Sequence, residues 1–259
     1  MTRLGARELL DTVLDPGSWQ SWDVPPHQVA EHGSPYAAEL LAAATKAGTD
    51  ESLITGQGRL QGRSVALVVG EFRFMAGSTG HAAAERLVLA LERATREGLP
   101  MIAAPASGGT RMQEGTSAFV AMVKISAAVA AHKEAGLPYL VYLRHPTTGG
   151  VLASWGSLGH VTVAEPGALI GFLGPRVYEA LYGAPFPQGV QVAENLYERG
   201  LVDAVLPVDA LAEVANRALN VLMAPREGLP EAPDLPDEPL PDIPAWDSIV
   251  RSRRPERPG

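Results

Sequence analysis

Two stretches with the same local pattern decide the fold: GLPMIAAPASGGTR at residues 98–111 and GLPYLVYLRHPTTGG at residues 136–150. Each begins with glycine, which suits the left-handed residue that ends a helix, and a proline two positions later keeps the helix from continuing. A short apolar run of strand length comes next. Each stretch then reaches a glycine pair, where a ligand can approach the backbone closely. The pattern therefore predicts, twice, a helix end, a strand and a candidate ligand-binding loop.

Helices and strands alternate along the chain around these stretches. Apolar spacing and helix-ending glycines predict helices at 7–14, 35–48, 81–97, 115–135, 149–155, 175–181, 190–199 and 208–223. Apolar or alternating runs predict strands at 65–70, 71–75, 101–104, 139–143, 161–164, 168–171 and 201–205, with a hairpin turn within 55–63. In the helix at 115–135 we expect the core face to carry Phe119, Met122, Val123, Ile125 and Val129. The alternation is typical of an α/β domain.

The composition, 46% hydrophobic and 19% charged, is that of a soluble globular protein. A net charge of -8 with only three lysines argues against nucleic-acid binding. The chain has no cysteine, which excludes a disulfide framework, and its six histidines show no metal-ligand spacing. No uninterrupted apolar run approaches a membrane span, and the N-terminus lacks the apolar core of a signal peptide. We therefore expect a cytoplasmic protein with no metal site and no membrane contact.

Composition also divides the chain into three parts. The sequence of residues 1–34 predicts an N-terminal helical arm, and we expect Trp19 and Trp22 to anchor this arm to the core. Residues 35–223 carry the α/β domain. Residues 224–259 form an extended tail, first rich in proline and acidic residues and then, after Trp246, rich in arginine. A docking peptide and a tail without fixed structure both remain open for its arginine-rich end.

The two glycine loops are the candidate reaction centre. Amides at the start of a helix point outward and favour negative charge, so the two loops could hold one oxyanion between them. A pair of tight turns explains the same glycines. Arg111 either pairs with Glu114 or reaches an anion, and we expect a structural role for His145, which lies beside the second loop. No acid/base pair stands out, which suits a protein that mainly stabilises an enolate.

Four segments resemble one known family. They are EFRFMAGS at 71–78, SGGTRMQEG at 107–115, PTTGGV at 146–151 and AEPGALIGFLGPRV at 164–177. In this order they are similar to the carboxyltransferase β subunit of bacterial acetyl-CoA carboxylase. The arm around Trp19 and Trp22 resembles the actinobacterial type, in which the β and α halves are fused.

The resemblance implies a crotonase-like fold, a ββα spiral, and a CoA thioester as substrate. It places the catalytic backbone amides at Gly108, Gly109, Gly149 and Gly150. It implies that an α-type partner holds carboxybiotin, which a biotin carboxyl carrier protein delivers, and that the subunits form an oligomer. The biotin ureido anion then takes the acyl proton, so the β subunit needs no general base. The expected reaction is carboxylation of a short acyl-CoA, and the first candidate is the conversion of acetyl-CoA to malonyl-CoA.

The same motifs suggest four substrate-binding residues, which are Met75, Gly77, Arg111 and Thr148. Two features depart from the family pattern. Many β subunits carry a four-cysteine zinc ribbon, which this chain lacks, and its tail resembles the opening of an α half. Two rival functions therefore stay open. One is a biotin-independent malonyl-thioester decarboxylase or a related acyl-CoA enzyme, and the other is a subunit that only scaffolds an assembly.

Overall fold

The computed structural model describes residues 4–225 and 243–254. The chain forms two compact units, residues 1–224 and residues 225–259. Most of the predicted acidic linker, residues 226–242, lies outside the described residues, as does the end of the arginine-rich tail at 255–259. In the second unit the described residues form one helix, α9 (Ala245–Ser252).

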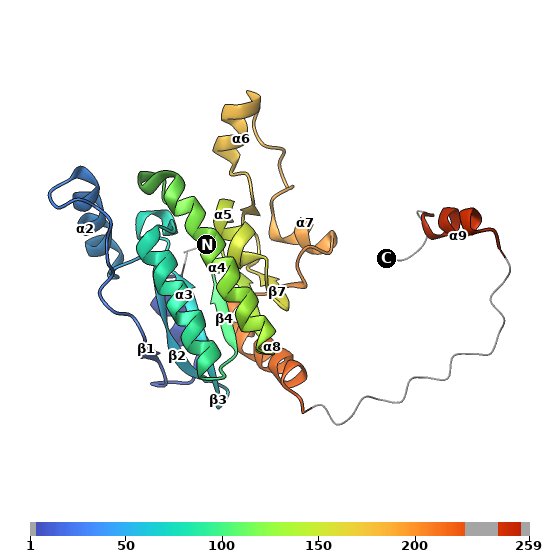
Figure 1. Ribbon diagram of the computed structural model, residues 1–259, viewed down its shortest axis with the longest axis horizontal. Coiled ribbons are helices and arrows are strands. Elements are labelled where there is room, and N and C mark those ends of the chain that lie inside the picture. The colour runs from blue at the N-terminus through green and yellow to red at the C-terminus, as the bar shows by residue number, and fades with distance from the viewer. Residues whose placement is uncertain (1–3, 226–242, 255–259) are drawn as a thin grey trace. The chain divides into compact units, whose positions relative to one another are not determined.

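The first unit consists of alternating strands and helices (Figure 1). Its strands are β1 (Gln20–Ser21), β2 (Leu53–Leu60), β3 (Arg63–Gly70), β4 (Met101–Ala104), β5 (Tyr139–Leu143), β6 (Thr147–Thr148), β7 (Val161–Ala164), β8 (Ile170–Gly171) and β9 (Ala204–Val205). Its α-helices are α1 (Ala6–Val13), α2 (Pro35–Ala47), α3 (His81–Arg96), α4 (Gly115–Glu134), α5 (Gly149–Val151), α6 (Pro175–Tyr182), α7 (Ala193–Glu198) and α8 (Val208–Leu222). Short 3₁₀ turns η1 (Met75–Gly77) and η2 (Met112–Glu114) and the π-helical turn η3 (Leu152–Gly156) complete it.

The main sheet has seven strands in the order β1-β2-β3-β4-β5-β7-β9. The first three strands pair antiparallel, and the pairs from β3 to β9 are parallel. Each parallel step returns through at least one helix, as parallel strands require. A second, two-stranded parallel sheet pairs β6 with β8.

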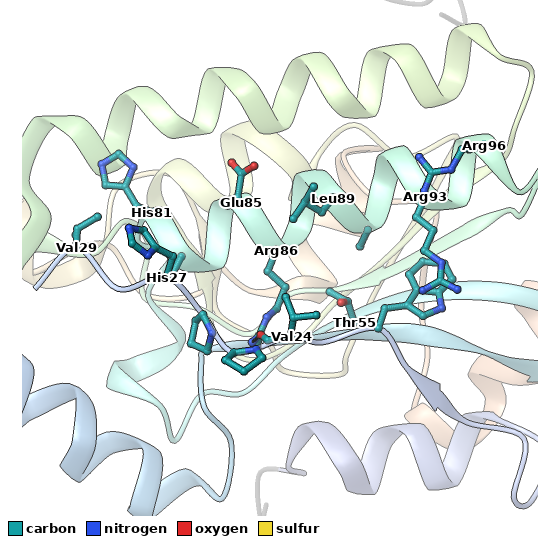
Figure 2. Close-up of a pocket in the computed structure, with 15 residues that line it drawn as sticks. Val24, His27, Val29, Thr55, His81, Glu85, Arg86, Leu89, Arg93 and Arg96 are labelled. Carbon is teal, nitrogen blue, oxygen red and sulfur yellow. Dashed lines mark hydrogen bonds between the residues drawn. The ribbon is translucent and has the colours of Figure 1, made fainter.

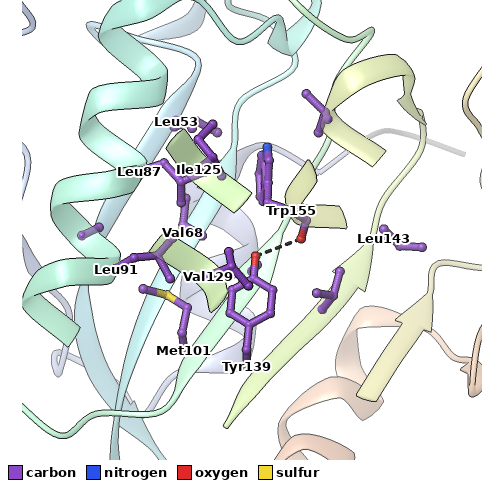
Figure 3. Packing of buried hydrophobic residues seen from close by; sticks show 14 of the residues in the cluster. Leu53, Val68, Leu87, Leu91, Met101, Ile125, Val129, Tyr139, Leu143 and Trp155 are labelled. Atoms are coloured by element: carbon purple, nitrogen blue, oxygen red, sulfur yellow. Dashed lines mark hydrogen bonds between the residues drawn. The ribbon is translucent and has the colours of Figure 1, made fainter. Parts of the chain in front are cut away.

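The sheet separates two apolar cores. On one face α3 and α4 lie side by side, and their buried residues pack with alternate residues of β3, β4 and β5. Figure 3 shows this core, in which the Tyr139 hydroxyl donates to the Trp155 carbonyl at 2.9 Å. On the other face α1 and α8 cover the remaining strand residues. Because both faces are covered, the parallel strands β4 and β5 are apolar throughout, as their sequences predict.

The N-terminal arm belongs to the first unit. Strand β1 pairs with β2, and the Arg93 guanidinium lies 4.5 Å from the Trp22 ring centroid. The predicted hairpin turn at 55–63 is shorter than expected, because Gly56 and Gly58 lie inside β2 and only Gln61 and Gly62 turn. A Cβ on Gly56 would collide with Trp19, and one on Gly58 would meet Leu14 at 2.5 Å. These glycines therefore make room for the arm.

Two predictions about local structure are wrong. Residues 71–75 form a turn leading into η1 rather than a strand, because the buried Glu71 carboxylate accepts from the Ala6 amide (2.8 Å) and the Arg73 amide (2.9 Å). In α4, Phe119 and Val123 face outward, with 54% and 69% of their surface exposed.

The stretch Met112–Glu134, which includes α4, is long and apolar enough to cross a membrane by length and composition. Core helices of soluble proteins pass the same test. One face of α4 packs into the core through Ala118, Met122, Ile125 and Val129. The exposed apolar side chains form the opposite face, which therefore needs a separate explanation.

Candidate active site

The candidate site lies where four chain segments meet beyond the carboxyl ends of the parallel strands. Parallel bridges join Thr79 to Thr110 and Ser107 to Thr147, and β6 continues the ladder to β8. The Arg111 amide donates to the Thr79 carbonyl at 3.0 Å, and the Thr148 amide donates to the Ser107 carbonyl at 3.0 Å. This edge is where α/β sheets commonly bind ligands.

The ladder brings together the four glycines that sequence reasoning proposed as catalytic. A Cβ on Gly109 would lie 3.6 Å from the Thr148 carbonyl oxygen and 3.7 Å from the Gly149 Cα. Gly109 and Gly149 both have positive φ, at 118° and 64°. Gly108 is exposed, whereas Gly150 is buried beside Thr110. The two glycine loops therefore form one surface made of backbone.

Three of these four amides are already hydrogen-bonded. The Gly108 amide donates to the Ala76 carbonyl (2.9 Å), the Gly109 amide to the Ser107 hydroxyl (3.0 Å), and the Gly149 amide to the Phe172 carbonyl (3.1 Å). They hold the loops in place, so the prediction that these three amides bind an oxyanion does not match their bonding in this structure.

Two other amides are available at the same loops. Gly150 is in the first turn of α5, and Ala76 is in the first turn of η1, where amides have no acceptor within the helix. Neither amide donates to any acceptor among residues 4–225 and 243–254. Ala76 adjoins Gly108 through its carbonyl, and Gly150 follows Gly149, so the two amides flank the same loop at 107–110.

Sequence reasoning missed Ala76 and named its neighbours Met75 and Gly77. Met75 and Ala76 have φ values of 45° and 55°, a left-handed conformation that costs residues other than glycine about 1–2 kcal/mol each. Such strain gathers at functional sites. A Cβ on Gly77 would collide with the Ala106 carbonyl, so Gly77 is needed for packing. Nothing in the amino-acid sequence around Met75 and Ala76 indicates that these two residues adopt a left-handed conformation.

Arg111 does not reach the site surface. Its side chain is fully buried in an ion pair with Glu51, and Nη2 also donates to the Ser78 carbonyl at 2.7 Å. Its guanidinium lies 3.7 Å from the Glu114 carboxylate. The alternative in which Arg111 binds an anion is therefore corrected to a structural role. The predicted pairing with Glu114 is present, although Glu51 is the nearer partner.

Two further candidates have local structural partners. The Thr148 hydroxyl is buried and donates to the Ser107 carbonyl at 3.3 Å, which leaves it to brace the first loop from the second. His145 Nδ1 accepts from the Leu169 amide at 3.0 Å, which fits the structural role expected of it. Among the described residues, no group of three His, Asp or Glu side chains could hold a metal ion.

A cavity of about 580 Å³ lies away from these loops, between the N-terminal arm and α3 (Figure 2). Its lining includes Trp22, Val24, His27, His81 and Arg96, and none of the glycines of the two loops. The indole nitrogen of Trp22 is buried without a partner in the described part of the chain. The cavity follows the seam where the arm packs on α3.

Exposed apolar side chains lie on the elements that carry the site. On η2 and α4 they are Met112 (88% exposed), Phe119, Val120 and Val123. The position of a Cβ on Gly150 lies 3.8 Å from Phe119, so this face begins at the second glycine loop. Large apolar side chains exposed at neighbouring positions of one helix, as at Phe119, Val120 and Val123, are typical of an interaction surface.

Comparison with known sequences gives a match along almost the whole chain. The family described as "Carboxyl transferase domain" matches residues 2–258. The probable biotin-dependent acyl-coenzyme A carboxylase beta3 subunit of Mycobacterium tuberculosis is 61% identical over 259 residues, which are all of this chain and 52% of that protein. The chain thus spans about half the length of the first curated relatives it matches. The acetyl-coenzyme A carboxylase carboxyl transferase subunit beta of Opitutus terrae is 41% identical over 226 residues, covering 85% of this chain and 76% of that one.

Solved structures show the same fold. The transcarboxylase 12S core with bound methylmalonyl-coenzyme A matches with a TM-score of 0.70 at 25% identity, over 84% of this chain and 41% of that chain. A chain of the Pseudomonas malonate decarboxylase hetero-tetramer in complex with malonate matches with a TM-score of 0.67 at 26% identity, over 98% of this chain and 92% of that one. The predicted crotonase-like fold is confirmed.

Proposed function

Because the chain belongs to the carboxyl transferase domain family, we propose that it is the acyl-CoA-binding half of a biotin-dependent acyl-CoA carboxylase. The observation that carries the proposal is a pair of backbone amides that have no hydrogen-bond acceptor among the described residues. They belong to Ala76 and Gly150, on either side of the loop at 107–110. Two such donors match the oxygen of a thioester, on which negative charge develops when the α-carbon loses a proton. The strain at Ala76 keeps its amide turned away from ordinary backbone pairing.

This chain's residues have a limited set of tasks in the reaction. The amides of Ala76 and Gly150 bind the thioester oxygen and stabilise the enolate. The hydrogen bonds that the Gly108, Gly109 and Gly149 amides donate hold the Ala76 and Gly150 amides in position. Carboxybiotin on a carrier protein supplies the carboxyl group when bound. Gly108 is exposed, and a Cβ there would come no nearer than 3.6 Å to a neighbour, so this face leaves room for a second reactant.

An α-type partner completes the site in this proposal. The curated relative with 61% identity matches this chain over 52% of its own length. The apolar face of Met112, Phe119, Val120 and Val123 adjoins the second glycine loop and suits a subunit that closes over it. The proposed substrate is a short acyl-CoA, with acetyl-CoA to malonyl-CoA as the first reaction to test.

The test is carboxyl transfer from malonyl-CoA to biocytin, measured with the chain alone and with an α-type partner. Transfer only with the partner supports the proposal, and no transfer in either case contradicts it. Gly150→Pro removes one amide donor without breaking a hydrogen bond within α5, while Gly150→Ala keeps the amide and adds the same Cβ, 3.0 Å from Thr110 Cγ2. Loss of one such donor costs about 10²–10³ in kcat, so the proline variant should fall well below the alanine variant.

One observation favours a second candidate, biotin-independent decarboxylation of a malonyl thioester. The Pseudomonas malonate decarboxylase chain, which was solved in complex with malonate, shares this fold at 26% identity and a TM-score of 0.67. The same amides would stabilise the enolate left by loss of CO₂. Release of CO₂ from malonyl-CoA by the chain alone, without biotin, would favour this function over carboxyl transfer.

A further inference from the structure

Helix α2 is held against the rest of the first unit with few apolar contacts. Ser34 caps its N-terminus by accepting from the Ala37 amide at 3.2 Å, and Pro35 occupies its first turn. Along the helix only Leu40 is buried, and half of the other side chains are alanines, which offer little apolar surface. The apolar core therefore does not explain why α2 docks where it does.

Polar contacts attach α2 to η2, the turn that directly follows the first glycine loop. The Tyr36 hydroxyl donates to Glu114 Oε1, and Gln113 Nε2 donates to the Glu39 carboxylate at 3.0 Å. Burial, and then the hydrogen bond to Glu114, raise the pKa of the Tyr36 hydroxyl well above its usual range. Tyr36 is therefore protonated near neutral pH, where its hydroxyl is a hydrogen-bond donor.

Glu114 joins three segments at once. Its side chain is only 2% exposed, and its second oxygen accepts from the His81 amide at 2.6 Å, which caps α3. The same carboxylate fills the space that a Cβ on Gly80 would need. It also lies 3.7 Å from the buried Arg111 guanidinium. A buried carboxylate with this many partners holds its own loop rigidly against α3.

The loop that Glu114 holds is the one that orients the proposed site. Residues 107–110 lie just before it, and the Gly108 amide fixes Ala76 through its carbonyl oxygen. A chain of direct contacts and short backbone links thus runs from Tyr36 through Glu114 and Gly108 to the Ala76 amide.

We propose that α2 is a strap for the first glycine loop and that Tyr36 is a positioning residue for the Ala76 amide. Tyr36 touches neither reactant. It acts by keeping Glu114, and through it the loop at 107–115, in the conformation that presents the site. This inference rests on the proposed function for its effect on turnover, whereas the strap itself does not depend on which thioester reacts.

The experiment compares Tyr36→Phe with the wild-type chain in complex with an α-type partner. Loss of a hydrogen bond to a charged group corresponds to a factor of about 10 to 100 in an equilibrium constant. We expect kcat to fall by a factor in this range, and KM for acyl-CoA to change less than about threefold. We also expect faster amide hydrogen exchange at residues 107–115. Thr45→Ala, on the exposed side of the same helix, is the matched control and should leave kcat, KM and exchange unchanged.

Unchanged exchange at 107–115 in Tyr36→Phe overturns the strap. Faster exchange with unchanged kcat overturns the positioning role, as does a rise in KM alone. If the wild-type complex transfers no carboxyl group, the proposed function fails, and the exchange measurement still decides whether α2 holds the loop. Glu114→Gln leaves one acceptor oxygen for the two donors, Tyr36 and His81, and removes the charge beside Arg111, so exchange at 107–115 should be at least as fast as in Tyr36→Phe.

Discussion

Gly149 faces Gly109 so closely that a Cβ on Gly149 would lie 3.4 Å from the Cα of Gly109. Neither residue has a side chain to place between the two backbones, and both adopt positive φ. The two loops therefore face each other through main chain alone, and a Cβ on either glycine would come into van der Waals contact with the opposite loop.

This contact predicts the effect of Gly149→Ala. The new Cβ meets the first loop at 3.4 Å and strains a residue with φ of 64°. A shift of about 1 Å at a reaction site can cost 10²-fold in rate, and we expect a loss of that order in carboxyl transfer. The control is Gly136→Ala, which has φ of 77° and open space around it, far along the chain from the loops. Equal activity of both variants would contradict the prediction.

Gly77→Ala should destabilise the fold strongly. The added Cβ would collide with the Ala106 carbonyl, and φ is 65°. We expect the free energy of unfolding to fall by about 3 kcal/mol or more, because neither backbone can move without breaking the ladder. Urea denaturation measures this. Gly62→Ala has a similar φ, 83°, with nothing nearby, and should cost only about 1–2 kcal/mol.

Arg111→Met should destabilise the protein by about 3–5 kcal/mol, since it leaves the buried Glu51 carboxylate without its main partner. The comparison is Arg217→Met, which removes an exposed ion pair with Glu213 and should cost less than about 1 kcal/mol. Urea unfolding of the two variants, side by side, tests this. Equal and small effects would mean that the Arg111 pair contributes no more than a surface contact.

The buried His132 predicts a pH dependence of stability. Burial lowers the pKa of His132 below its usual value, so the folded state binds fewer protons than the unfolded state as pH falls. Its contribution is complete above about pH 6.5, the usual value for histidine, and is lost progressively below it. The free energy of unfolding should therefore drop between pH 7.5 and 5. His132→Gln should show a smaller drop, and an equal one would assign the effect to other groups.

Helix α9 is expected to dock on the α-type partner. Trp246, Ile249 and Val250 lie on one face at helical spacing, and each is at least 40% exposed. Deletion of residues 245–259 should weaken the complex, and Trp246→Ala alone should weaken it about tenfold, as loss of one large buried side chain does. Ser248→Ala is the control, and isothermal titration provides the affinity. Unchanged affinity after the deletion would refute docking through this helix.

Much of the strand and helix order could be predicted from local patterns. The apolar runs in β3, β4, β5 and β7 are strands because both faces of the sheet are covered. The segment at 71–75 misled the same reasoning. Its alternation of charged and apolar residues imitates a strand, whereas the Glu71 carboxylate is buried because it binds the amides of Arg73 and of Ala6, which is 65 residues away in the chain.

The errors at the site have a common physical cause, contacts between distant parts of the chain. Phe119 and Val123 have the spacing of core residues, and nothing in the sequence distinguishes a core face from one that awaits a partner. Ala76 gains its importance from a left-handed φ that its neighbours impose. The bond from Tyr36 to Glu114 spans 78 residues, beyond the reach of any local pattern.

The ladder at the site has a consequence for the order of folding. Its bridges join residue 79 to 110, 107 to 147, and 147 to 170, so each step closes a loop of roughly 20 to 40 residues. Closing such loops has an entropic cost that the main sheet must offset first. During synthesis the ladder cannot be complete before residue 171 has left the ribosome. Its short strands are therefore among the last parts of this unit to form and the first to open under mild denaturation.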